Sequence, residues 1–223
     1  MHNMKANLAV ASAFTLVFLL NYLDGYIKAD LYRLYPLYFW VFDFTKFVLV
    51  PGLCLAALAT WSGVKPRHYG LGWPALTKTE FLTIAVLVTF TMQVVYYYAS
   101  HLSWRILAGA TPPQFNYSET IPPGLAGKLV AVYFAATAAL VEEIYYRGLT
   151  WRLLEGSFSP GVRKIVYTLG AASFFAAIHW ENGSPELIAT FAYGVAACLW
   201  YLRLRNLWPL VLAHFVIDLW FYW

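Results

Sequence analysis

Six ionisable side chains stand in the apolar C-terminal part of this chain of 223 residues. They are Glu142, Glu143, Arg147, His179, His214 and Asp218. An ionisable group at the centre of a membrane-spanning helix costs about 2.5–3.5 kcal/mol on insertion scales, and such groups usually have a function and a partner inside the protein. Carboxylates and imidazoles shielded from water suit general acid–base catalysis. The set therefore predicts proton-transfer chemistry within a helical bundle.

The spacing of these residues indicates which of them can be partners. Glu143 and Arg147 are four residues apart with the acid first, which is the favourable order for an ion pair on one helix face. Glu142 is rotated by about 100° from its neighbour, so it can face a different partner. We therefore expect Glu143 to be paired within its own helix and Glu142 to be available for another contact.

The same spacing of four residues recurs on two later apolar segments. His214 and Asp218 share one face of the last segment, and Phe175 lies one helical turn before His179. A group of Glu-Asn-Gly-Ser-Pro at 181–185 follows His179 and is a strong helix breaker. His179 is therefore expected where a helix ends inside the protein, which is tolerated at membrane depth only against protein or a water-filled cavity.

The elements that position these side chains are predicted to be membrane helices. Hydrophobic residues make up 61% of the chain and charged residues 12%, whereas a soluble protein carries about 25% charged residues. Apolar runs long enough for the bilayer, roughly 20 residues, recur along the sequence. The expected spans are 5–22, 38–61, 81–99, 127–146, 164–180, 186–202 and 207–223. The fold class is an all-α polytopic transmembrane bundle with about seven or eight spans.

The chain is expected to form one membrane domain with two parts. Residues 1–126 contain N-terminal helices, and residues 127–223 contain a four-helix catalytic core with the polar residues of interest. Helical composition runs from Gly124 through Leu154 without proline, a length of about 45 Å at 1.5 Å per residue. Glu142 is thus expected well inside a long helix.

Charge outside the spans predicts orientation rather than a nucleic-acid partner, because the Lys and Arg are scattered among the loops and the net charge is only +4. With a cytoplasmic N-terminus, ten Lys and Arg fall on the cytoplasmic side, and Lys28, Arg33, Arg105 and Lys128 fall on the other. The positive-inside rule favours this orientation. Asp43 and Lys46, three residues apart in the second span, are interpreted as a structural ion pair.

The polar positions also form three short motifs in order along the chain. They are Glu-Glu-x-x-x-Arg at 142–147, Phe-x-x-x-His at 175–179 and His-x-x-x-Asp at 214–218. Each motif alone is weak, but three on successive predicted helices are fairly specific. Over residues 125–223 the chain resembles the CAAX-protease and bacteriocin-processing family of glutamic intramembrane proteases. The N-terminal half is similar to that family only in being helical and apolar.

The resemblance implies an endopeptidase that hydrolyses a peptide bond in a hydrophobic or lipidated substrate within the bilayer, with no cofactor. Glu142 would act with His179 to activate a water for attack on the scissile carbonyl. His214 and Asp218 would hold the developing oxyanion. The family often has Asn at the last position, and an ionised Asp218 cannot donate a hydrogen bond, so its role stays open between oxyanion binding and orientation of His214.

The remaining motif positions would support the catalytic groups. The resemblance implies that Glu143 and Arg147 orient Glu142, and Phe175 places a large ring beside His179. The short loops and the absence of an extra domain favour a multi-pass protein of a prokaryotic cell membrane. The sequence gives no indication of the oligomeric state.

Two other functions remain compatible with the same residues. A non-proteolytic scaffold or immunity protein could use this fold to bind a peptide or partner, although every expected polar position is occupied. A metal-dependent hydrolase or transporter is the other alternative, because Glu142, His179, His214 and Asp218 could ligate a divalent cation such as zinc. Sensitivity of the activity to chelators would separate the glutamate hypothesis from the metal hypothesis.

Overall fold

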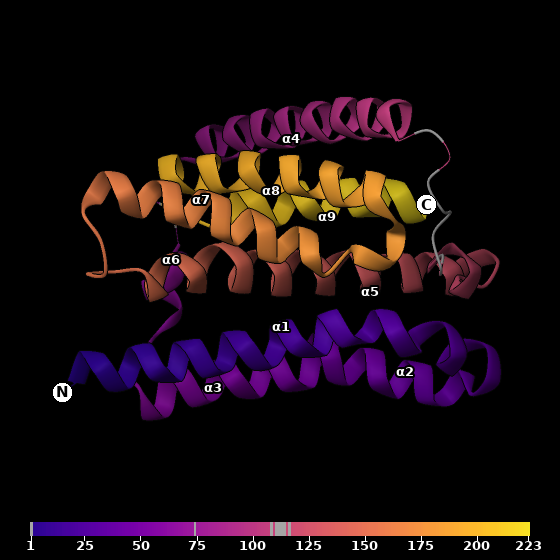
Figure 1. Cartoon of the computed structure of the whole chain (residues 1–223), viewed down its shortest axis with the longest axis horizontal. Coiled ribbons are helices and arrows are strands. Elements are labelled where there is room, and N and C mark those ends of the chain that lie inside the picture. Colours follow the sequence, from indigo (N-terminus) through magenta and orange to yellow (C-terminus); the bar gives the residue numbers. More distant parts are fainter. Residues whose placement is uncertain (1, 74, 108, 110–114, 116) are drawn as a thin grey trace.

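A computed structural model describes residues 2–73, 75–107, 109, 115 and 117–223, and the regular elements among them are helices. Figure 1 shows three groups of roughly parallel or antiparallel helices, with α1 (His2–Leu34) and α3 (Val50–Trp61) along one edge and α4 (Lys78–Ile106) along the other. The remaining long helices lie between them. The all-α prediction is therefore confirmed.

The N-terminal part is a helical hairpin. After α1, Pro36 occupies the first turn of α2 (Pro36–Phe44), where its missing N–H leaves no hydrogen bond unmade. A π-helical segment η1 (Thr45–Leu49) joins α2 to α3, so that one apolar helix runs from Pro36 to Trp61 and packs on α1. The turn η2 (Pro66–Tyr69) then leads to α4, which begins with a capping box between Thr77 and Glu80.

The C-terminal part holds four long helices packed together, and the first of them is continuous through α5, η4 and α6. Its elements are η3 (Tyr117–Thr120), α5 (Gly124–Glu142), the π-helical η4 (Glu143–Leu149), α6 (Thr150–Leu153), α7 (Pro160–Ala177), η5 (Trp180–Asn182), α8 (Ser184–Leu204) and α9 (Trp208–Tyr222). Helix α8 packs between α7 and α4, and α9 packs against α5 and α4. The polar motifs consequently come from elements that are neighbours in space.

Five helices among the described residues are long and apolar enough to cross a membrane. They are Met4–Leu34, Pro36–Trp61, Lys78–Ile106, Gly124–Leu153 and Ser184–Leu204. The chain is a polytopic helical membrane protein. Helix α9 is apolar but shorter, and α7 has 18 residues without reaching the same hydropathy.

The predicted end of the first helix, near residue 22, was wrong. Helix α1 continues to Leu34, and Lys28, which the charge count placed in a loop, lies 3% exposed inside the protein. Charged residues inside a helix normally indicate its end, but these have buried partners. Arg33 also belongs to α1, in its last turn.

The predicted ion pair between Asp43 and Lys46 was also wrong. The Lys46 ammonium lies 2.6 Å from Asp24 of α1, and Asp43 accepts a hydrogen bond of 2.9 Å from Tyr133 of α5. The π-helical turn that begins at Thr45 changes the direction of side chains relative to an ideal α-helix. Spacing of three residues therefore did not bring the two charges together.

The long helix that carries Glu142 is continuous from Gly124 to Leu153, about 45 Å, as predicted. Its π-helical segment η4 was not predicted, because a wide turn has no sequence signature comparable to proline. Within η4, Gly148 lies so close to η2 that an added Cβ would be 2.3 Å from the carbonyl oxygen of Tyr69. Glycine is thus required for the contact that fixes the end of this helix.

Replacing Gly148 with Ala should lower the free energy of unfolding by about 1–3 kcal/mol through overpacking. The matched variant is Gly170→Ala in α7, where an added Cβ meets nothing within 4 Å. Thermal unfolding of both proteins in one detergent measures the difference. Equal midpoints for the two variants would show that the backbone of η2 can move away at little cost.

Candidate active site

A cavity of about 470 Å³ opens between the N-terminal hairpin and the C-terminal helices. Its lining includes five of the side chains singled out from the sequence, namely Glu142, Phe175, His179, His214 and Asp218. They come from α5, α7, α9 and the turn after α7. Residues up to 76 positions apart in the chain, from 142 to 218, therefore meet around one space.

The paired glutamates stand at the junction between α5 and η4. Glu142 ends the α-helix and is 5% exposed, whereas Glu143 begins the π-helical segment and is 0% exposed. π-Helical segments inside α-helices are frequent at functional sites, where the wide turn redirects side chains. Here the two neighbouring carboxylates have different surroundings: Glu142 lies in the cavity wall and Glu143 lies behind it.

His214 lies among three carboxylates. Its Nδ1 is 2.9 Å from Oε1 of Glu143, while its Nε2 is 3.7 Å from Oε2 of Glu142 and 3.4 Å from Oδ2 of Asp218. An ionised carboxylate can only accept, so the ring donates through Nδ1 to Glu143. The other nitrogen is thereby directed at the cavity.

Behind this histidine, Glu143 is held by Arg147, as the spacing predicted. The Arg147 Nε is 3.3 Å from Oε2 of Glu143, and both side chains are fully buried. The guanidinium also lies over the ring of Phe175, with 4.1 Å between its central carbon and the ring centroid. The pair was expected to orient Glu142, but its hydrogen bond goes to His214.

His179 lies two residues after the end of α7 at Ala177, in agreement with the helix breaker that comes next. Its Nδ1 is 2.8 Å from the carbonyl oxygen of Phe175. A carbonyl only accepts hydrogen bonds, so Nδ1 carries the proton and Nε2 of the neutral ring is an acceptor. The Phe175 ring packs on the imidazole, with 4.9 Å between centroids.

The cavity also contains ionisable residues that sequence reasoning did not connect with the site. They are Asp24, Lys28, Lys46, Glu181 and Glu186. Glu186, near the start of α8, accepts a hydrogen bond of 2.9 Å from the hydroxyl of Tyr96 in α4. A usable signal existed in the first helix, where Asp24 and Lys28 are four residues apart in an apolar run.

Among the residues that the structure describes, no group of three or more His, Cys, Asp or Glu side chains is arranged to hold a metal ion. The carboxylates of Glu142 and Asp218 each lie within ion-pair distance of His214. The arrangement is one in which protons can be exchanged between carboxylates and imidazoles around a shared space.

Comparison with known proteins adds one finding. Neither the curated proteins nor the solved structures include a match to this chain. A family model described as type II CAAX prenyl endopeptidase Rce1-like matches residues 125–220. The matched range begins in α5, ends in α9 and includes all three polar motifs. Residues 125–220 therefore form a domain of the Rce1-like type II CAAX prenyl endopeptidase family.

Proposed function

We propose that the protein is a glutamic-type intramembrane endopeptidase that hydrolyses a peptide bond in a hydrophobic or lipidated peptide. The observation that carries the proposal is the shared cavity, where Glu142, His179 and His214 are brought together from separate helical elements. The family match at residues 125–220 supports proteolysis as the reaction class. In this proposal the whole chain forms one membrane domain, and residues 127–223 are its catalytic core.

Glu142 and His179 activate the water in this proposal. Among the described residues, the partner of the Glu142 carboxylate is His214, at 3.7 Å, and His179 presents an acceptor nitrogen. The water gives one proton to this pair as its oxygen bonds to the scissile carbonyl carbon. When the carbon–nitrogen bond breaks, the proton passes to the leaving amine, which completes general acid–base catalysis.

His214 stabilises the negative charge that develops on the carbonyl oxygen. With Nδ1 bonded to Glu143, a second proton on Nε2 makes the ring a charged donor toward the cavity, and the surrounding carboxylates stabilise this form by Coulomb attraction. Glu143 and Arg147 fix the ring direction. Asp218 orients the same nitrogen when ionised, or donates to the oxyanion when protonated.

The substrate class follows from the lining of the cavity. Aromatic side chains face the space beside the polar groups, namely Phe47, Trp104, Phe134, Phe221 and Tyr222. Such walls suit an apolar side chain or a lipid chain more than a charged peptide. We further propose that α7 and α9 also cross the bilayer, giving seven spans, with a cytoplasmic N-terminus in a prokaryotic cell membrane.

The proposal is tested with purified protein in lipid nanodiscs and an internally quenched peptide ending in a farnesylated cysteine plus three residues. We expect cleavage, and a higher kcat/KM than for the same peptide without the farnesyl group. Cleavage is measured by fluorescence and the product by mass spectrometry. Binding of both peptides without any hydrolysis would favour the scaffold alternative.

Chelation should leave this activity unchanged. The three carboxylates around His214 already have its imidazole as a partner, and the proposed mechanism moves protons without a Lewis acid. Rates are compared before and after incubation with EDTA and with 1,10-phenanthroline, followed by dialysis. Loss of activity that returns on addition of zinc would replace the glutamate mechanism with the metal-dependent one.

A further inference from the structure

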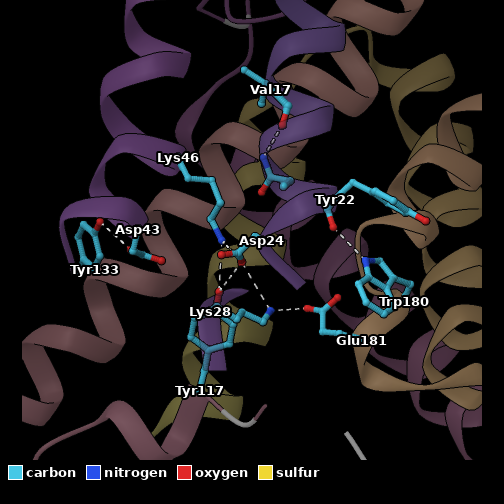
Figure 2. A network of polar contacts seen from close by, with 11 residues as sticks. Val17, Tyr22, Asp24, Lys28, Asp43, Lys46, Tyr117, Tyr133, Trp180 and Glu181 are labelled. Carbon is cyan, nitrogen blue, oxygen red and sulfur yellow. Dashed lines mark hydrogen bonds and ion pairs between the residues drawn. The ribbon is translucent and has the colours of Figure 1, made fainter. Parts of the chain in front are cut away.

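We infer that α1, which lies outside the matched domain, positions His179 by clamping the turn that follows it. The η5 clamp consists of Tyr22, Gly25 and Lys28 of α1 together with Trp180 and Glu181 of η5. Figure 2 shows these side chains except that of Gly25. The inference deepens the proposed function, on which it rests, because it assigns to the N-terminal part a role in holding one of the two water-activating groups.

The first contact of the η5 clamp is made by Trp180. Its indole Nε1–H donates a hydrogen bond of 2.9 Å to the carbonyl oxygen of Tyr22. This carbonyl lies in the interior of α1, so the indole bonds to a backbone group that the helix holds in place. The indole also packs over Gly25, where an added Cβ would lie 2.8 Å from Cε2 of Trp180. Glycine therefore allows the ring to lie directly on the helix backbone.

The second contact is an ion pair between Lys28 and Glu181, which are 3% and 5% exposed. Figure 2 shows how this pair continues into the N-terminal hairpin. Asp24 lies 3.7 Å from the Lys28 ammonium and 2.6 Å from that of Lys46. Two lysines and two carboxylates thus balance each other. A buried pair of this kind is costly to break on one side, so it holds η5 in one place.

The backbone transmits this constraint to His179. Helical hydrogen bonding of α7 ends there, and the carbonyl oxygen of His179 accepts instead from the N–H of Asn182 in η5, at 3.0 Å. The next bond, from Gly183 to the carbonyl of Trp180, closes the turn at 3.1 Å. His179 is therefore held by α7 on one side and by η5 on the other. Movement of η5 would swing the imidazole away from Glu142.

The same side chains face the space in which the reaction is proposed to occur. Lys28 and Glu181 line the cavity together with His179 and Glu142. A displacement of about 1 Å at a catalytic group can lower the rate about 10²-fold without loss of folding. The η5 clamp is consequently expected to control kcat, and the residues in it are positioning residues, not groups that contact the reacting atoms.

The test compares two glycine substitutions in the full chain, with the quenched farnesylated peptide as substrate. Gly25→Ala should lower kcat by about 10–100-fold while KM changes by less than about twofold. Gly52→Ala, in α3, is the matched control because an added Cβ there meets nothing within 4 Å. The inference would be overturned if Gly25→Ala had the kcat of the wild type, or if Gly25→Ala and Gly52→Ala lost kcat equally.

Two further variants keep the test decisive if Gly25→Ala fails to fold. Trp180→Phe removes the donor to Tyr22 and shortens the ring, and should lower kcat with the same unchanged KM. The double variant Gly25→Ala/Trp180→Phe should be no slower than Trp180→Phe alone, because the atoms that meet the added methyl are gone. Additive losses in the double variant would contradict a specific contact between the two residues.

Charge neutralisation tests the ion pair in the same way. Lys28→Met leaves Glu181 buried without its partner and should lower kcat more than the double variant Lys28→Met/Glu181→Gln, in which no charge is left over. Equal kcat in these two variants would remove the ion pair from the inference. Full activity in every clamp variant with an inactive Glu142→Gln protein would reject the η5 clamp alone, whereas an active Glu142→Gln protein would reject the proposed function.

Discussion

Replacing Glu142 with Gln is expected to lower kcat for the quenched farnesylated peptide by about 10²–10⁴-fold, the usual contribution of a positioned general base. Glutamine keeps the size of the side chain and its ability to lie in the cavity wall, but it cannot take a proton from water. Because the carboxylate is 3.7 Å from His214 and makes no shorter ion pair, the fold should tolerate the change. KM should change little.

The control for this variant is Glu155→Gln. Glu155 lies in the exposed turn after α6, pairs with Arg152 at the surface and does not line the cavity. Its substitution should leave both kcat and the thermal midpoint close to those of the wild type, because surface pairs contribute little. An active Glu142→Gln protein, with a normal midpoint, would show that Glu142 is not the base and would reject the proposed function.

The second largest effect is expected at His214. The substitution His214→Gln should lower kcat by about 10²–10³-fold, which is typical for loss of an oxyanion donor. The amide N–H can donate one hydrogen bond to Glu143, so this carboxylate keeps a partner beside Arg147, but the amide carries no positive charge toward the cavity. The loss should be in kcat because the oxyanion exists only after water has attacked.

His101→Gln is the matched control, since this histidine is exposed on α4 and stacks on Tyr97. Steady-state kinetics of both variants over a range of peptide concentration gives kcat and KM separately. A raised KM with unchanged kcat in His214→Gln would mean that the histidine binds the substrate and not the developing charge.

Hydropathy predicted most of the helical fold because lipid imposes a simple requirement, a helix of roughly 20 apolar residues. The segments from Pro36 to Trp61 and from Gly124 to Leu153 coincide closely with runs read from the sequence. Prediction from hydropathy fails where a charged side chain in a helix is neutralised by a partner inside the protein. In α1 the charges of Asp24 and Lys28 suggested a helix end, although both are neutralised by residues distant in sequence.

For the candidate site, spacing within one helix was informative and spacing between helices was not. The pairs Glu143–Arg147 and His214–Asp218 were both expected from i, i+4 geometry, and both lie within 4 Å. The contact between Glu143 and His214 joins positions 71 residues apart, and no periodicity predicts it. It depends on the π-helical turn of η4, which also went unpredicted.

The contribution of the N-terminal part could not be predicted for the same reason. The family match covers residues 125–220, but the cavity wall includes Asn21, Asp24 and Lys28 of α1. Glu181 looked like part of a helix breaker, because Glu followed by Asn and Gly normally indicates an exposed turn. Its burial becomes understandable only when Lys28 is placed opposite to it.

The most direct test is an experimental structure of the protein in a lipid nanodisc at a resolution that shows ordered water. We expect a water within about 2.6–3.2 Å of both a carboxylate oxygen of Glu142 and Nε2 of His179. We also expect His214 on the same side of that water. Apolar side chains packed between Glu142 and His179, or an imidazole turned out of the cavity, would contradict this expectation.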